Sequence, residues 1–170
     1  MSERIVVNAV NAANAASAAR LASSNTARWL TFAGIIPFVA LLALMFVTDY
    51  WQNAAQRGLY LQLLTTYAAV ILSFLGGIQW GIGLSIADCA PRSAQTLFYL
   101  SVVPSLLAWT MLMIAHPTSR IVAAIFIFGF VWVIDTLLNL QKLIPAWFYK
   151  LRTIITGSVI SVLVVVAIKI

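Results

Sequence analysis

The sequence predicts an all-α integral membrane protein, a bundle of five transmembrane helices. The chain has 170 residues, of which 63% are hydrophobic and only 8% charged, with a mean hydropathy of +1.02. Soluble domains are about half apolar and about one quarter charged, so this chain has too little polar surface to cover its apolar residues in water. Five apolar stretches each approach the ~20 residues that a helix needs to cross a hydrocarbon core of about 30 Å.

The five stretches follow one another with short connections. Each is too long for a single strand, and none alternates with the two-residue period of a barrel strand, so helices are expected. The predicted spans are residues 29–48, 63–86, 95–115, 120–138 and 153–168.

The connection before the last predicted span is expected to lie at the membrane interface. Residues 141–152 contain Pro145 and an aromatic run at 147–149, beside Lys150 and Arg152. Aromatic rings favour the headgroup level, and long cationic side chains reach from there into water.

Residues 1–28 form a polar leader, rich in Ala, Asn and Ser, that is expected to be mobile, and residues 29–170 form the transmembrane domain. Arg4 is followed by no apolar core of the kind that a secretory signal contains. Three arginines with a single acid also resemble the composition of a mitochondrial transit peptide. A bacterial inner (plasma) membrane is the expected location, with the mitochondrial inner membrane as the alternative.

The basic residues predict the orientation. In a five-span arrangement, the side of the N-terminus holds most of them, and short loops rich in Lys and Arg stay in the cytoplasm. We therefore expect a cytoplasmic N-terminus. The N-terminal side holds Arg4, Arg20, Arg28, Arg92, Lys142, Lys150 and Arg152, and the opposite side holds Arg57, Arg120 and Lys169.

The composition disfavours several classes of function. The net charge of +6 is spread over loops and termini rather than gathered on a basic face, which argues against nucleic-acid binding. Cys89 and His116 are the only residues of their kinds, which argues against a metal site. We find no catalytic constellation and no phosphate-binding loop, so we expect no catalytic residue, cofactor or metal. The expected partners are the lipid bilayer and other membrane proteins or a second copy of the chain.

The strongest candidate for function is Asp135, the only acid within the five predicted spans. An acid is expensive to place in lipid, so it should face protein or water. In the predicted topology, polar residues gather in the inner halves of the spans, which suggests a polar cavity or a set of paired side chains. Asp135 either pairs with a cation such as Lys142, Lys150 or Arg152, or hydrogen-bonds Gln79 or a hydroxyl, or handles a ligand or proton. The candidate residues are Gln79, Trp80, Ser105, Asp135 and Arg152.

A stripe of small residues is predicted on the second span. Ser73, Gly77 and Gly81 recur every four residues, with Gly76 and Gly83 alongside. Small residues at this spacing let another helix approach closely in a membrane, so the stripe is interpreted as a helix-packing face.

Three motifs and the acid resemble a known family. They are SFLGGIQWG at residues 73–81, SVVPSLLAW at 101–109, Asp135, and PAWFYKLR at 145–152. Together they resemble the uncharacterised family typified by transmembrane protein 69, which also occurs in bacteria as a domain of unknown function. The resemblance covers about residues 32–165 and implies a small multi-span membrane protein. It supplies no activity or catalytic residue.

Two functions are therefore expected. The first is that of a non-catalytic partner, an assembly or stability factor for a membrane complex. The alternative is a small transporter or a membrane protein that binds a ligand, lipid or proton in an inward-facing polar cavity around Asp135. An intramembrane enzyme comes third.

Overall fold

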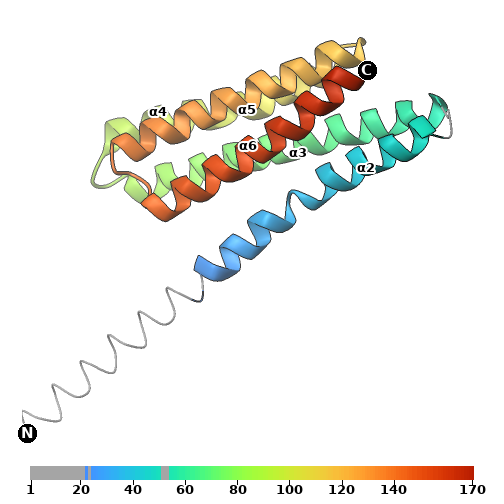
Figure 1. Ribbon diagram of the computed structural model, residues 1–170. Coiled ribbons are helices and arrows are strands. Elements are labelled where there is room, and N and C mark those ends of the chain that lie inside the picture. Colours follow the sequence, from blue (N-terminus) through green and yellow to red (C-terminus); the bar gives the residue numbers. More distant parts are fainter. Residues whose placement is uncertain (1–21, 23, 51–53) are drawn as a thin grey trace, which may run out of the picture. The chain divides into compact units, whose positions relative to one another are not determined.

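The computed structural model describes residues 22, 24–50 and 54–170, and the chain divides into two units, Met1–Gly34 and Ile35–Ile170. Within the first unit, residues 24–33 are helical. The described part of the second unit is also helical (Figure 1). Its elements are α2 (Ile36–Tyr50), α3 (Ala54–Ile86), α4 (Pro91–Leu112), α5 (Pro117–Leu140) and α6 (Ala146–Lys169).

The prediction of five transmembrane helices is confirmed. In the described residues, five helices are long and apolar enough to cross a membrane. They are Ser24–Val47, Ala55–Ile86, Pro91–Leu112, Pro117–Leu140 and Ala146–Lys169. Most of the predicted leader, residues 1–21 and 23, lies outside the described residues. Its last residues, 24–28, are already helical.

Prolines explain where several helices begin. Pro91 and Pro117 each occupy the first turn of a helix, where the missing N–H would have no partner in any case. Pro145 is the N-cap of α6. Only residues 141–145 of the expected interfacial connection lie outside helices, because residues 146–152 form the first turns of α6. This is a correction to the prediction, and it places Arg152 on a helix rather than in a loop.

The two prolines within predicted spans behave differently. The helical path is interrupted by a turn at residues 34–35, just before Pro37, whose ring clashes with the preceding turn of a helix. Pro104 is buried within α4, which continues past it to Leu112.

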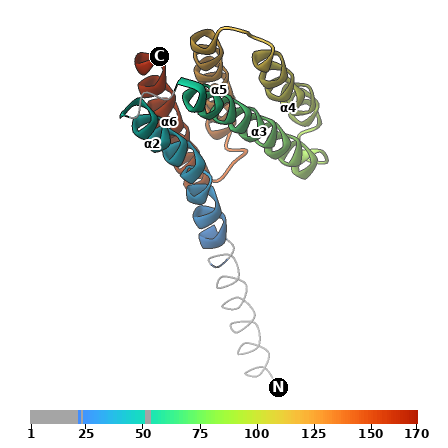
Figure 2. The same ribbon diagram turned by 90° about the vertical axis from the view of Figure 1, so that its right-hand side faces the viewer.

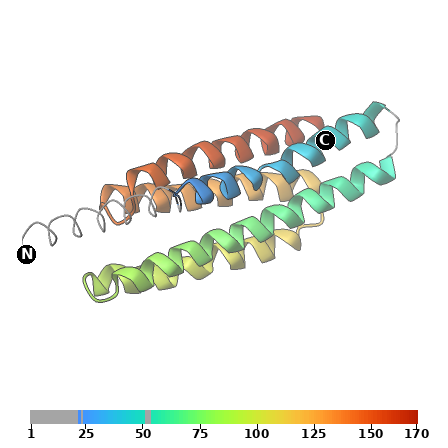
Figure 3. The same ribbon diagram turned by 90° about the horizontal axis from the view of Figure 1, so that it is seen from below.

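The core of the second unit lies where α2, α3 and α5 meet. Phe38 on α2 is fully buried, and its ring contacts Tyr67 on α3 and Phe128 on α5, with centroids 5.0 and 6.3 Å away. Around this centre, α3 packs along α4 and α5 packs along α6 (Figures 2 and 3). Successive helices run in opposite directions, so α3 and α5 begin at one end of the bundle and end at the other.

Candidate polar site between α5 and α6

An ion pair joins α5 to α6 inside the bundle. Arg152 donates hydrogen bonds from Nε and Nη2 to Oδ2 of Asp135, at 2.9 and 2.7 Å. The pair is buried, with 3% of Asp135 and 4% of Arg152 exposed. Three cations were predicted as possible partners of Asp135. In the structure the partner is Arg152, while Lys142 and Lys150 are exposed.

Two further side-chain contacts flank the ion pair on the same pair of helices. Trp132 Nε1 donates to Thr153 Oγ1 at 3.2 Å, and the hydroxyls of Thr136 and Tyr149 lie 3.2 Å apart. These contacts and the ion pair form one polar seam, which we call the α5–α6 seam. Its residues are Trp132, Asp135 and Thr136 on α5 and Tyr149, Arg152 and Thr153 on α6.

The sequence analysis missed four members of this seam, although a signal was present. On each helix the three residues stand at positions i, i+3 and i+4, which share one helix face. The two triplets lie on either side of a short turn ending at Pro145, so an antiparallel hairpin brings them together in reverse order. Reading the two faces jointly would have predicted the register.

Chemically, the seam brings a carboxylate and a permanently protonated guanidinium together away from water. Their opposite charges compensate each other in surroundings where either charge alone would be very unfavourable. The arrangement therefore stabilises the hairpin and fixes its register.

Gln79 on α3 lies beside this ion pair. Its side chain adjoins the Asp135 carboxyl group, and the residue is only 1% exposed. Neither Nε2 nor Oε1 makes a hydrogen bond of regular geometry with a described residue. Buried amides are nearly always hydrogen-bonded, so Gln79 is the unusual polar group of this site.

The other two cavity candidates lie elsewhere. Trp80 is 46% exposed, and its ring contacts that of Phe98 on α4 in a tilted arrangement, with centroids 4.9 Å apart. Ser105 is half-buried at the contact between α3 and α4, where its Oγ faces Gly76. The structure thus brings together Gln79, Asp135 and Arg152, and leaves Trp80 and Ser105 outside that cluster.

Two different sets of glycines occupy α3. A Cβ added at Gly76 would collide with the backbone oxygen of Ser101, and one at Gly83 would lie 2.9 Å from the Phe98 ring, so these glycines allow α4 to approach. Ser73, Gly77 and Gly81, the predicted packing stripe, are exposed. A Cβ at Gly77 or Gly81 would meet nothing within 4 Å.

The helix contact inside the chain thus uses other glycines than the predicted packing stripe. The close helix contact inside the chain uses Gly76 and Gly83, and the stripe of Ser73, Gly77 and Gly81 faces away from it. The spacing of four residues identified a helix face, but could not indicate which of two adjacent glycine faces turns inward.

No group of three or more His, Cys, Asp or Glu side chains that could hold a metal ion occurs in the described residues. Asp135 is the one acid of the polar site, and its partner is a cation.

Comparison with known proteins gives a family and no activity. The profile of a family described as "Protein of unknown function (DUF3429)" matches residues 23–168. The chain is 37% identical to "Transmembrane protein 69" of Xenopus tropicalis over 131 residues, which is 76% of this chain and 49% of that protein. It is 30% identical to "Transmembrane protein 69" of Mus musculus over 136 residues, which is 80% of this chain and 53% of that protein.

The chain spans about half the length of these curated relatives. No solved structure matches it. The family profile covers most of the chain and, together with the five apolar helices, confirms the resemblance seen in the motifs. The chain therefore belongs to the DUF3429 family and is similar to proteins named transmembrane protein 69.

Proposed function

We propose that this membrane protein is a non-catalytic partner that helps a membrane complex to assemble or to remain stable. Its docking face is the outward stripe of α3, formed by Ser73, Gly77 and Gly81, and its occupant is a transmembrane helix of another polypeptide. The proposed location is a bacterial inner membrane with a cytoplasmic N-terminus, and a mitochondrial inner membrane is the alternative.

The observation that carries this proposal is the contrast between the two glycine sets of α3. Gly76 allows the Ser101 backbone of α4 to approach more closely than a larger residue would permit, and Gly83 makes room for the Phe98 ring. Gly77 and Gly81 leave open space at the height of the same helix contact. In lipid, helices associate through close packing over small residues, because apolar side chains gain little by leaving an apolar solvent.

The α5–α6 seam supports the same interpretation. The Asp135 carboxylate and the Arg152 guanidinium are directed at each other, at 2.7 Å, rather than toward a substrate. The charges in the membrane span thus join the two helices of a hairpin against which α3 packs. A scaffold of this kind suits a protein that supports another one.

The test compares oligomeric and complex states in a mild detergent. Gly77→Leu and Gly81→Leu, separately and together, should dissociate a specific assembly containing wild-type protein, as measured by native mass spectrometry. Gly157→Leu is the matched control, because Gly157 is an exposed glycine of α6 where a Cβ would also meet nothing within 4 Å. It should leave the assembly intact.

A wild-type protein that stays monomeric in native membranes after cross-linking would refute the proposal. If the associated helix belongs to a second copy of this chain, the docking face is a contact within a homo-oligomer. Loss of the assembly with Gly157→Leu as well would also count against a specific face.

A second candidate function rests on Gln79. Its buried amide has no regular hydrogen bond and adjoins Asp135, so a small polar ligand or a proton-carrying water chain could use that position. Gln79→Leu is nearly the same size and removes the amide. Loss of a solute or proton flux in proteoliposomes, with the assembly intact, would favour this function over the partner function.

A further inference from the structure

A small cavity lies between α3 and α5, at the end of the bundle where both helices begin. It has a volume of about 140 Å³. Its lining residues are Gly58, Leu61, Gln62, Thr65, Pro117, Arg120 and Ile121. The Asp135 site lies near the other end of α5, so the two sites are separate.

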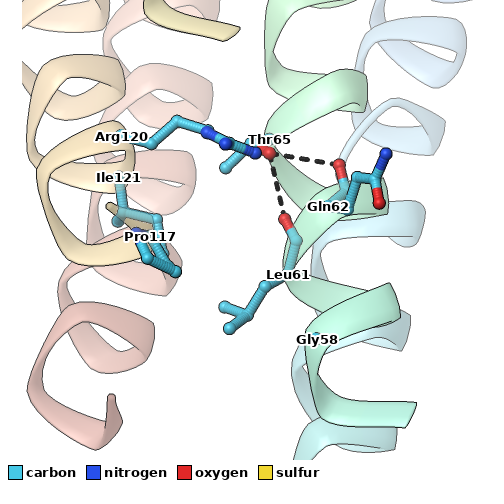
Figure 4. A pocket seen from close by; sticks show the side chains of 7 residues that line it. All are labelled: Gly58, Leu61, Gln62, Thr65, Pro117, Arg120 and Ile121. Carbon is cyan, nitrogen blue, oxygen red and sulfur yellow. Dashed lines mark hydrogen bonds between the residues drawn. The ribbon is translucent and has the colours of Figure 1, made fainter. Parts of the chain in front are cut away.

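The cavity has one polar and one apolar side. Figure 4 shows Arg120 of α5 reaching toward Thr65 of α3, while Leu61, Pro117 and Ile121 lie beneath them. Thr65 is 2% exposed, and its hydroxyl donates to the backbone carbonyls of its own helix, which leaves its oxygen as an acceptor. A ligand that fits must itself have a polar and an apolar part.

Arg120 supplies the charge of the cavity. Its Nε and Nη2 donate to the backbone oxygen of Ile114 at 2.9 and 2.6 Å, which fixes the half-buried guanidinium. The remaining N–H groups of the fork, including those of Nη1, have no partner among the described residues. A guanidinium held in this way is suited to an anionic oxygen.

Neither aspartate side chain that the structure describes compensates this charge, and the side chain of Asp49, at the end of α2, lies outside the described residues. Asp88 follows the end of α3 and Asp135 lies near the end of α5, so both stand at the opposite end of the bundle. Arg120 also lies in the first turn of α5, where unpaired backbone N–H groups add to the positive potential. The cavity therefore attracts an anion that the described residues of the chain do not supply.

We propose that this cavity binds the phosphate headgroup of an anionic phospholipid. Arg120 binds the phosphate oxygens, and the first part of the acyl region rests on Pro117 and the exposed edge of Leu61. Gly58 lines the cavity, and a Cβ there would meet nothing within 4 Å, so a larger side chain at this position has room to occupy the cavity. The position at a helix end suits a headgroup, because cations at that level attract acidic lipids. The proposal does not depend on the partner function.

The test measures the thermal unfolding midpoint of the full chain in a mild uncharged detergent. Dioleoylphosphatidylglycerol, dioleoylphosphatidylcholine and inorganic phosphate are added in separate titrations. Phosphatidylglycerol should raise the midpoint of the wild type, and phosphatidylcholine should raise it much less. Arg120→Gln should weaken the apparent affinity for phosphatidylglycerol about tenfold or more, the effect of one lost charge-assisted hydrogen bond.

Two matched variants make the result specific. Arg92→Gln removes an exposed cation of α4 and should respond like the wild type. Gly58→Leu fills the cavity without changing any charge and should abolish the lipid effect, whereas Gly157→Leu should retain it. If Arg120→Gln does not fold, Gly58→Leu alone decides the outcome.

Three results would overturn the proposal. One is equal stabilisation by phosphatidylcholine and phosphatidylglycerol, and another is an undiminished lipid response in Gly58→Leu. The third is full stabilisation by inorganic phosphate alone, which would make the ligand a free anion rather than a lipid.

Discussion

Arg152 Nη2 lies 2.7 Å from Asp135 Oδ2, and this contact spans the antiparallel pair of helices α5 and α6 within the bundle. The contact pairs Asp135, the only acid in the five spans, with Arg152, the first buried cation of the next helix. The ion pair, rather than an open cavity, is the dominant polar feature of the second unit, and its loss has consequences that can be measured.

Replacing Asp135 by Asn should destabilise the protein, because Arg152 would keep its charge in a buried position without a counterion. Breaking a buried pair by removing one partner costs about 3–5 kcal/mol, and less where water can reach the remaining charge. The fall in thermal unfolding midpoint in detergent measures the effect. The double variant Asp135→Asn with Arg152→Gln should recover part of the loss, since the unpaired charge is gone.

Lys150→Gln is the control for that experiment, because Lys150 is an exposed cation only two residues from Arg152. It should neither lower the stability of the wild type nor rescue Asp135→Asn. A fully stable Asp135→Asn protein would contradict a structural role and favour the ligand- or proton-handling alternative.

The Trp132–Thr153 hydrogen bond should contribute measurably to the hairpin. Trp132→Phe and Thr153→Val each remove one partner, and the double variant should be less destabilised than the two single effects added together. Hydrogen bonds between membrane helices contribute about 0.6 kcal/mol on average. A double-mutant cycle on the free energy of unfolding measures the coupling between the two residues. If the two single effects simply add up in the double variant, the 3.2 Å contact contributes nothing to stability.

Gly76→Ala should destabilise the α3–α4 contact far more than Gly77→Ala. The added Cβ at Gly76 collides with the Ser101 backbone, which cannot move aside like a flexible side chain, whereas Gly77 has open space. Overpacking costs about 1–3 kcal/mol in well-packed proteins. Thermal unfolding of the two variants compares neighbouring residues of identical type, and equal midpoints would contradict the assignment of the two faces.

The orientation can be tested at Cys89, which is exposed between α3 and α4. With a cytoplasmic N-terminus, a membrane-impermeant thiol reagent should leave Cys89 unlabelled in intact cells. Labelling should appear once the cells are permeabilised, which controls for reactivity. Labelling in intact cells would reverse the predicted topology.

The sequence predicted the helices well because their signal is local. An uninterrupted apolar stretch of sufficient length determines a membrane span, and proline marks where several helices begin. The start of α3 was predicted late, at residue 63 instead of Ala54, because its first turns carry polar residues such as Arg57 and Gln62. These residues dilute the apolar signal without breaking the helix.

The candidate site was predicted less completely because it depends on rotation and register between helices. Asp135 and Arg152 could be nominated as charges in apolar surroundings, and Gln79 as a polar residue near the same level. Whether Trp80 points inward or outward depends on a helix rotation of about 100° per residue, which composition alone does not determine. The same ambiguity separates Gly76 from Gly77.

The α5–α6 seam also bears on how the chain enters the membrane during synthesis. Asp135 and Arg152 stand on consecutive helices joined by a short turn, so the hairpin contains a complete pair of opposite charges. A lone acid or arginine at the centre of an inserting helix costs about 2.5–3.5 kcal/mol on the translocon scale, and the cost is smaller for Asp135 and Arg152, which stand nearer the ends of their helices. A hairpin that closes its ion pair before leaving the translocon presents lipid with a neutral unit. We therefore expect membrane integration of α5 to depend on the synthesis of α6, since a ribosome that stalls between them would leave an acidic helix without its counterion.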